Sequence, residues 1–129
     1  MLDLSRMVAS HYESLGGEHK LRAIIDTFVD RVVADAMIGF FFRGVDRPRL
    51  KELEFQHAAQ ALGAPVAYRG RPLAEAHRQH QINGGQFARR RQILKEVLEA
   101  QAVPQTIIEA GLAHVDSLRG EIVRDESCR

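Results

Sequence analysis

The sequence predicts an all-α fold in a single domain. Along several segments apolar residues recur at the i, i+3, i+4, i+7 spacing of a helix with one buried face, and alternating strand patterns are absent. A chain of 129 residues, 45% of them hydrophobic, can bury one core but is too short for two. We therefore expect one domain over residues 1–129, with flexible tails at 1–10 and 124–129.

Four long helices are expected, at 18–35, 46–62, 86–101 and 105–123. The first places five apolar residues on one face: Leu21, Ile24, Ile25, Phe28 and Val32. Asp46 is a suitable N-cap for the second, with Pro48 in its first turn and Pro65 just beyond its end. The third follows 83–85 (NGG), and Pro104 starts the last. Between Leu62 and Gln81 only a short turn at 73–78 has helical character, and so long a loop suggests a functional segment.

The second expected helix carries two titratable residues within an apolar face. With residues about 100° apart, Glu54 and His57 fall inside an arc that comprises Leu50, Leu53, Phe55, Ala58, Ala61 and Leu62. A buried charge must be partnered, neutralised or placed at the edge of a wet cavity. Either Glu54 overhangs a ligand in the interior, or the arc is too wide and Glu54 reaches solvent at its rim.

Composition points to an ordinary globular protein with net charge +1 and 27% charged residues. The only basic cluster, 89–91 (RRR), spreads around its helix, so no nucleic-acid partner is expected. No stretch of roughly 18 apolar residues and no signal peptide is found, so we expect a cytoplasmic protein without membrane attachment. The single cysteine, Cys128, is expected to be a free thiol.

Residues 68–77 (YRGRPLAEAH), followed by Ile82, resemble the stretch that carries the haem-iron ligand in truncated haemoglobins. The resemblance continues through 12–17 (YESLGG), 40–42 (FFF), 61–65 (ALGAP) and 102–104 (AVP), in the order of that family. The first of its three subfamilies fits best, because the other two usually carry a tryptophan in the penultimate helix and this chain has none.

The resemblance implies a globin-like two-over-two helical sandwich that binds haem b, with His77 as the proximal iron ligand. It implies an apolar haem lining of Phe28, Val29, Phe42, Leu50, Leu53, Leu73, Ile82 and Phe87, with Glu54 on the ligand side and Arg49 and Tyr68 near the propionates. The implied function is reversible binding of O2, NO or CO, serving oxygen transport or storage, NO detoxification with NO dioxygenase-like activity, or sensing. A reductase is a candidate partner, and a monomer or weak dimer is expected.

Two positions depart from the family pattern. The tyrosine and glutamine that usually hold the bound gas match Val29 and Glu54. Valine has no donor, and glutamate is acceptor-only when ionised, although burial could keep it protonated and able to donate one hydrogen bond. His57 is a candidate second iron ligand or else a packed histidine.

Two alternatives stay open. The loss of both distal residues motivates a degenerate globin without haem that works as an interaction or sensory module. The Glu-x-x-His spacing of Glu54 and His57, with His77 and His80 one turn apart, motivates a carboxylate-bridged metal site. A di-iron bundle needs that motif on two helices and two further glutamates, however, and only one copy exists here.

Overall fold

The computed structural model describes residues 10–78 and 80–124 of the chain. Within these residues the structure is helical and contains no strand. In chain order the elements are α1 (His11–Leu15), α2 (Gly17–Ala34), the 3₁₀ turn η2 (Gly39–Phe42), α3 (Arg47–Ala61), α4 (Leu73–His77), α5 (Gly84–Ala100), α6 (Gln105–Ser117) and α7 (Arg119–Ile122).

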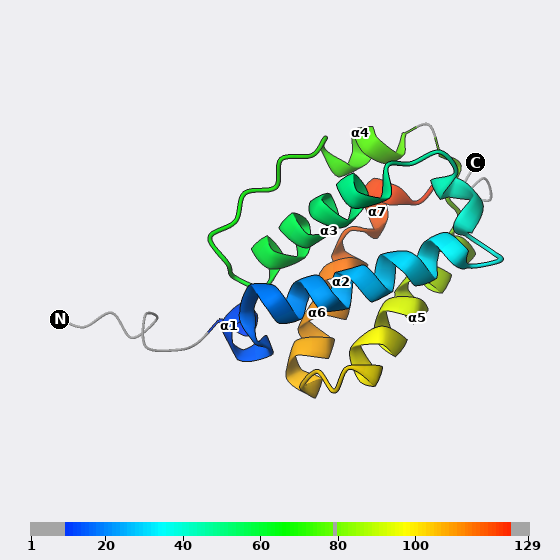
Figure 1. Cartoon of the computed structure of the whole chain (residues 1–129). Helices are drawn as coiled ribbons and strands as arrows, with labels where there is room; N and C mark the ends of the chain where they lie inside the picture. The colour runs from blue at the N-terminus through cyan, green and yellow to red at the C-terminus, as the bar shows by residue number, and fades with distance from the viewer. Residues whose placement is uncertain (1–9, 79, 125–129) are drawn as a thin grey trace.

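Two pairs of helices form the body of the molecule. Helices α2 and α3 run side by side, and α5 and α6 form a second pair that packs across them (Figure 1). Contacts join α2 to α5 and α3 to α6, so each pair covers the other. This arrangement confirms the predicted two-over-two sandwich.

The core lies between these pairs. All five residues predicted to line the inner face of α2 are buried, with Ile24 only 1% exposed. They meet Ile93 and Val97 from α5 and Ile107 and Ile108 from α6 in one apolar cluster. The spacing of apolar residues along α2 therefore identified the core correctly.

A tight glycine turn joins α1 to α2. Ser10 caps α1 by accepting a hydrogen bond from the backbone nitrogen of Glu13 at 3.1 Å. Gly16 then takes φ of 126°, a conformation that side chains other than hydrogen disfavour. The backbone nitrogen of Tyr12 donates to the carbonyl of Leu62 at 3.0 Å, which fixes α1 against the end of α3.

The expected continuous helix at 105–123 is wrong, because the chain breaks into α6 and α7. The Ser117 hydroxyl donates to the carbonyl of His114 at 2.5 Å, the acceptor that the nitrogen of Leu118 would use in an unbroken helix. That nitrogen instead bonds to the carbonyl of Val115 at 3.0 Å. A local side-chain hydrogen bond thus competes with the helix and ends it.

The apolar arc predicted on α3 is too wide. Ala61 is exposed, and Leu50, Leu53 and Ala58 are only half-buried. The most buried positions of α3 are Phe55, Gln56 and Ala59, which face α2 and the core. The half-buried side of α3 is the one that carries Glu54 and His57.

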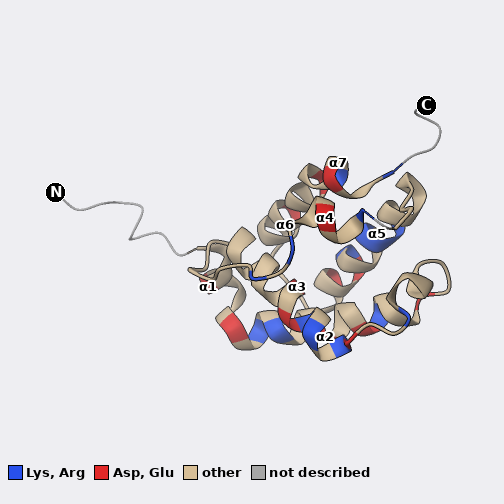
Figure 2. Cartoon of the chain, turned by 90° about the horizontal axis from the view of Figure 1, so that it is seen from above, with Lys and Arg blue, Asp and Glu red and all other residues tan. Residues whose placement is uncertain are grey.

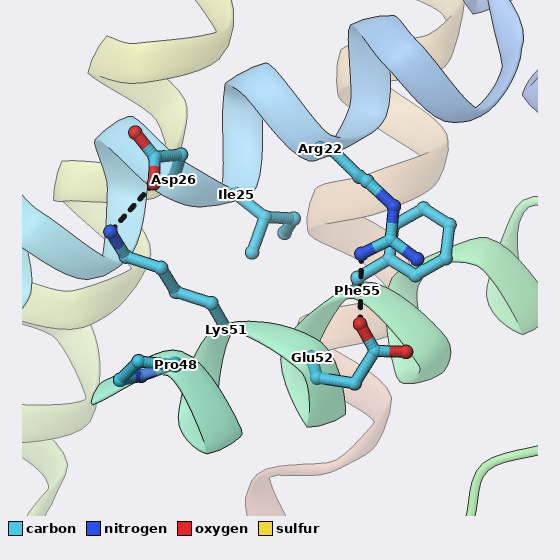
Figure 3. A pocket seen from close by; sticks show the side chains of 7 residues that line it. All are labelled: Arg22, Ile25, Asp26, Pro48, Lys51, Glu52 and Phe55. Atoms are coloured by element: carbon cyan, nitrogen blue, oxygen red, sulfur yellow. Dashed lines mark hydrogen bonds and ion pairs between the residues drawn. The ribbon is translucent and has the colours of Figure 1, made fainter. Parts of the chain in front are cut away.

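On the outer side, α2 and α3 are joined across a groove of about 240 Å³ (Figure 3). The guanidinium of Arg22 donates to Glu52 at 2.8 Å and lies 3.8 Å from the centroid of the Phe55 ring. Lys51 pairs with Asp26 at 2.6 Å at the other end of the groove. These pairs join the two helices, and none of the predicted site residues lines this groove.

Basic and acidic positions are interspersed over the helices (Figure 2). No helix among the described residues is long and apolar enough to cross a membrane.

Candidate functional site

The short helix α4 presents His77 with one ring nitrogen fixed. Pro72 precedes the helix, and the His77 Nδ1 atom lies 2.7 Å from the carbonyl oxygen of Leu73. Because a carbonyl can only accept, this contact assigns the proton to Nδ1. The Nε2 atom has no hydrogen-bond partner in the described part of the chain.

Burial favours the neutral form of this imidazole. Desolvation lowers the pKa of His77, and the hydrogen bond to Leu73 offsets this only in part. A neutral ring with Nδ1 protonated leaves the Nε2 lone pair available to a metal. The site therefore offers a single, oriented imidazole ligand.

Helix α4 rests on the C-terminal part of the chain. It packs against α7, which lies beside it in Figure 1. Just past α4, the backbone nitrogen of Arg124 donates to the carbonyl of Ile82 at 2.6 Å. The position of His77 thus depends on a segment far from it in sequence.

The predicted lining residues differ in burial. Phe28 and Val29 are each 2% exposed on α2, whereas Phe42 and Leu50 are half-buried against the core. Phe87 on α5 is buried but is not part of the main core cluster of the described residues. Leu53, Leu73 and Ile82 are half-buried.

Glu54 is paired with Arg90, the middle residue of the basic cluster 89–91. Arg90 Nη2 on α5 donates to Glu54 Oε1 at 3.2 Å and to Oε2 at 3.0 Å. The Arg90 guanidinium carbon also lies 4.9 Å from the centroid of the Phe28 ring. Of the possibilities open to a titratable group on this face of α3, Glu54 is thus the partnered one.

The three consecutive arginines of α5 each reach a different element. Arg89 pairs with Asp35 at the end of α2, Arg90 with Glu54 on α3, and Arg91 with Asp116 on α6. The absence of a common basic face was expected from their helical positions. Their ion pairs were not expected, because the sequence does not show which elements pack against α5.

Three rings gather beside α3. The centroid of His57 lies 5.4 Å from that of Tyr68 and 5.3 Å from that of His114 on α6. Burial lowers the pKa of His57, so its imidazole is mainly neutral at pH 7. His114 was missed by sequence reasoning, although it lies seven residues after the buried Ile107 and thus on a related face.

The loop before α4 is held by polar contacts. The Tyr68 hydroxyl donates to the carbonyl of Arg71 at 2.9 Å. The side chain of Gln56, only 8% exposed, accepts from the backbone nitrogen of Arg69 at 2.9 Å. Arg49 is exposed, and its guanidinium has no hydrogen-bond partner among the described residues.

The donor set fits haem better than a bare metal ion. Among residues 10–78 and 80–124 there is no group of three or more histidine, cysteine, aspartate or glutamate side chains that could hold a metal. Glu54 is occupied by Arg90, which leaves the carboxylate-bridged alternative without its bridging ligand. A single neutral imidazole beside half-buried apolar residues matches what a haem iron needs from a protein.

Residues 10–124 match the family model described as bacterial-like globin. The chain belongs to that family. Globins bind haem b and, through its iron, diatomic gases. The predicted haem cofactor and the predicted binding of a diatomic gas are therefore confirmed at the level of the family.

Relatives confirm the predicted subfamily. The Group 1 truncated haemoglobin GlbN of Mycolicibacterium paratuberculosis is 32% identical over 119 residues, which cover 92% of this chain and 88% of that protein. GlbN of Synechocystis is 32% identical over 101 residues, 75% of this chain and 82% of the relative.

Solved structures agree on the fold. The truncated haemoglobin of Tetrahymena pyriformis in its Fe(III) form superposes with a TM-score of 0.85 at 24% identity, over 91% of this chain and 100% of that one. The 2/2 haemoglobin of Synechococcus, solved in the cyanomet state with covalently attached haem, gives 0.81 at 25% identity, over 88% of this chain and 95% of that one.

Proposed function

We propose that His77 holds one haem b and that the loaded protein binds a diatomic gas reversibly on the side opposite His77. The observation that supports this proposal most directly is the orientation of the His77 ring. Its Nδ1 atom is fixed on the Leu73 carbonyl at 2.7 Å, and its Nε2 atom has no partner among the described residues. When bound, the haem supplies the iron atom that takes up the gas.

The residues around His77 would hold and shield the porphyrin. Phe28 and Val29 from α2 and Phe87 from α5 would supply apolar contacts, and the half-buried leucines of α3 and α4 would add to them. Arg49 has a free guanidinium that suits a propionate. Tyr68 would need to release the carbonyl of Arg71 to reach the other propionate.

The absorption spectrum of the purified, haem-reconstituted protein tests the cofactor. We expect a Soret band and one haem per chain. A chain that takes up no haem would support the alternative of a haem-free interaction or sensory module.

Replacing His77 with glycine tests the ligand. We expect His77→Gly to lose stable haem binding, and added imidazole to restore a five-coordinate ferrous spectrum by occupying the vacated position. The control is His80→Gly, because His80 lies three residues on and its ring packs on Phe41 at 5.9 Å. An unchanged ferrous CO spectrum in His77→Gly alone would assign the iron to another residue.

We propose oxygen transport or storage as the role of gas binding, with NO detoxification as the role if a reductase restores the iron after each turnover. Rates of NO consumption by the oxygenated protein, with and without a reducing system, separate the two.

A further inference from the structure

Arg90 occupies a defined position between three helices. Its guanidinium is held by both carboxylate oxygens of Glu54 on α3, at 3.2 and 3.0 Å, and by the Phe28 ring of α2. The Arg90 and Glu54 side chains are each 28% exposed, so they are partly shielded from solvent. An arginine held from two sides loses less freedom when it makes one more contact.

The ion pair lies among the residues proposed to surround the haem. The charges of both Arg90 and Glu54 act on the pKa of His77 and on that of His57. Phe28, which stacks under the guanidinium, is itself a proposed haem contact. The pair therefore lies within electrostatic range of both histidines and in contact with one proposed haem residue.

The Arg90 guanidinium has donors to spare. Only Nη2 bonds to Glu54; the Nε and Nη1 atoms have no hydrogen-bond partner among the described residues. Val29 has no donor, and an ionised Glu54 can only accept. Among Arg90, Glu54 and Val29, the guanidinium of Arg90 alone offers permanent positive charge and free N–H groups.

We propose that Arg90 determines which ligands the loaded protein prefers, by donating a hydrogen bond and positive charge to a ligand bound opposite His77. This inference rests on the proposed function. Anions and gases that draw negative charge onto their outer atom are favoured over neutral carbon monoxide. Glu54 positions the guanidinium and at the same time weakens its charge.

The two halves of the pair therefore have opposite effects on anion binding. Removing Arg90 deletes the donor and leaves an unpaired carboxylate that repels anions. Removing the charge of Glu54 leaves the arginine uncompensated and attracts them. A purely structural pair would weaken binding from either side, so the sign of the Glu54 effect distinguishes the two roles.

The experiment measures azide and fluoride binding to the ferric, haem-loaded protein. We expect Arg90→Leu to raise both dissociation constants at least about tenfold, the loss expected for a charge-assisted hydrogen bond. Glu54→Gln is expected to lower them roughly threefold or more. Arg91→Leu, which removes the neighbouring arginine paired with Asp116 on α6, is the matched control and should leave them unchanged.

Carbon monoxide supplies an independent spectroscopic signature. Its affinity should change little in Arg90→Leu, because CO carries little charge. The C–O stretching frequency of the ferrous carbonyl should rise, since the positive potential at the oxygen is replaced by that of a carboxylate, and it should fall in Glu54→Gln.

The outcomes separate this inference from the proposed function. A wild-type chain that takes up no haem overturns both. A chain that binds one haem, with anion affinities and a C–O frequency that are the same in Arg90→Leu as in Arg91→Leu, overturns the role of Arg90 alone. Weaker anion binding in Glu54→Gln as well as in Arg90→Leu also overturns it, because a structural ion pair behaves in that way.

Discussion

At the scale of single residues, the His114 side chain shows how burial of a polar atom affects stability. Its Nε2 atom is buried and has no hydrogen-bond partner among the described residues. Its ring packs 5.3 Å from that of His57, which is also half-buried. A buried polar atom without a partner costs stability, because it gives up its bonds to water and gains none.

We expect His114→Leu to stabilise the protein by roughly 1 kcal/mol, the lower end of the cost of an unpaired buried group. Leucine fills a similar volume and has no polar atom to satisfy. Urea unfolding at matched haem content measures the change as a higher midpoint with an unchanged slope. His19→Leu, on the exposed side of α2, is the control. A lower midpoint for His114→Leu would show that Nε2 has a partner that matters for stability.

At the scale of secondary-structure elements, ion pairs connect helix α5 to three other helices. Its arginines reach the end of α2, the middle of α3 and the far part of α6. The contact at Asp35 is the least exposed, since its side chain is 8% exposed while that of Asp116 is 51% exposed. Asp35 also accepts from the backbone nitrogens of Met37 and Ile38, at 3.0 and 3.2 Å, and so shapes the turn that ends α2.

Asp35→Asn should therefore destabilise the protein by about 1–3 kcal/mol at pH 7, the range for hydrogen bonds to a charged group. The pKa of Asp35 is lowered, first by the hydrogen bonds from Arg89. A lowered folded pKa stabilises the protein above the unfolded value near pH 4, and this contribution is lost as the pH falls through the folded pKa.

The difference in unfolding free energy between wild type and Asp35→Asn should thus shrink on acidification below about pH 4. Chemical unfolding across pH 2 to 7, roughly the range that spans carboxyl titration, measures it. Asp116→Asn is the matched control, because its exposed pair with Arg91 should contribute far less. A difference that stays constant with pH would mean that the charge of Asp35 is not what matters.

At the scale of the whole molecule, the sequence predicted those features that depend on residues close together along the chain. The apolar spacing of α2 predicted its buried face because one helix side meets a single core. The break at Leu118 was not predicted, since it depends on one serine hydroxyl competing for a carbonyl. The partner of Glu54 was not predicted either, because Arg90 is 36 residues away and only the packing of α5 against α2 and α3 brings it close.

The predicted site depends on the same long-range packing. The family resemblance selected His77, yet its support by α7 could not be read from a pattern that treated 105–123 as one helix. The core cluster is built from α1, α2, α3, α5, α6 and adjoining loops, and it contains no residue of α4 or α7. The core of the fold and the position of His77 are thus stabilised by separate parts of the chain.

A chain that ends after Leu118 should therefore keep its fold and lose its hold on haem. Its helix content by circular dichroism should fall only by the share of α7. Without α7 and the bond from Arg124 to Ile82, α4 loses its main support, so haem should dissociate at least roughly tenfold faster, the effect of about 1.4 kcal/mol. Transfer of haem to an excess of an apoglobin with higher affinity measures the rate. A chain that ends at Arg124 keeps both contacts and should match the full-length protein. Equal rates for all three would show that α4 holds His77 in place without α7.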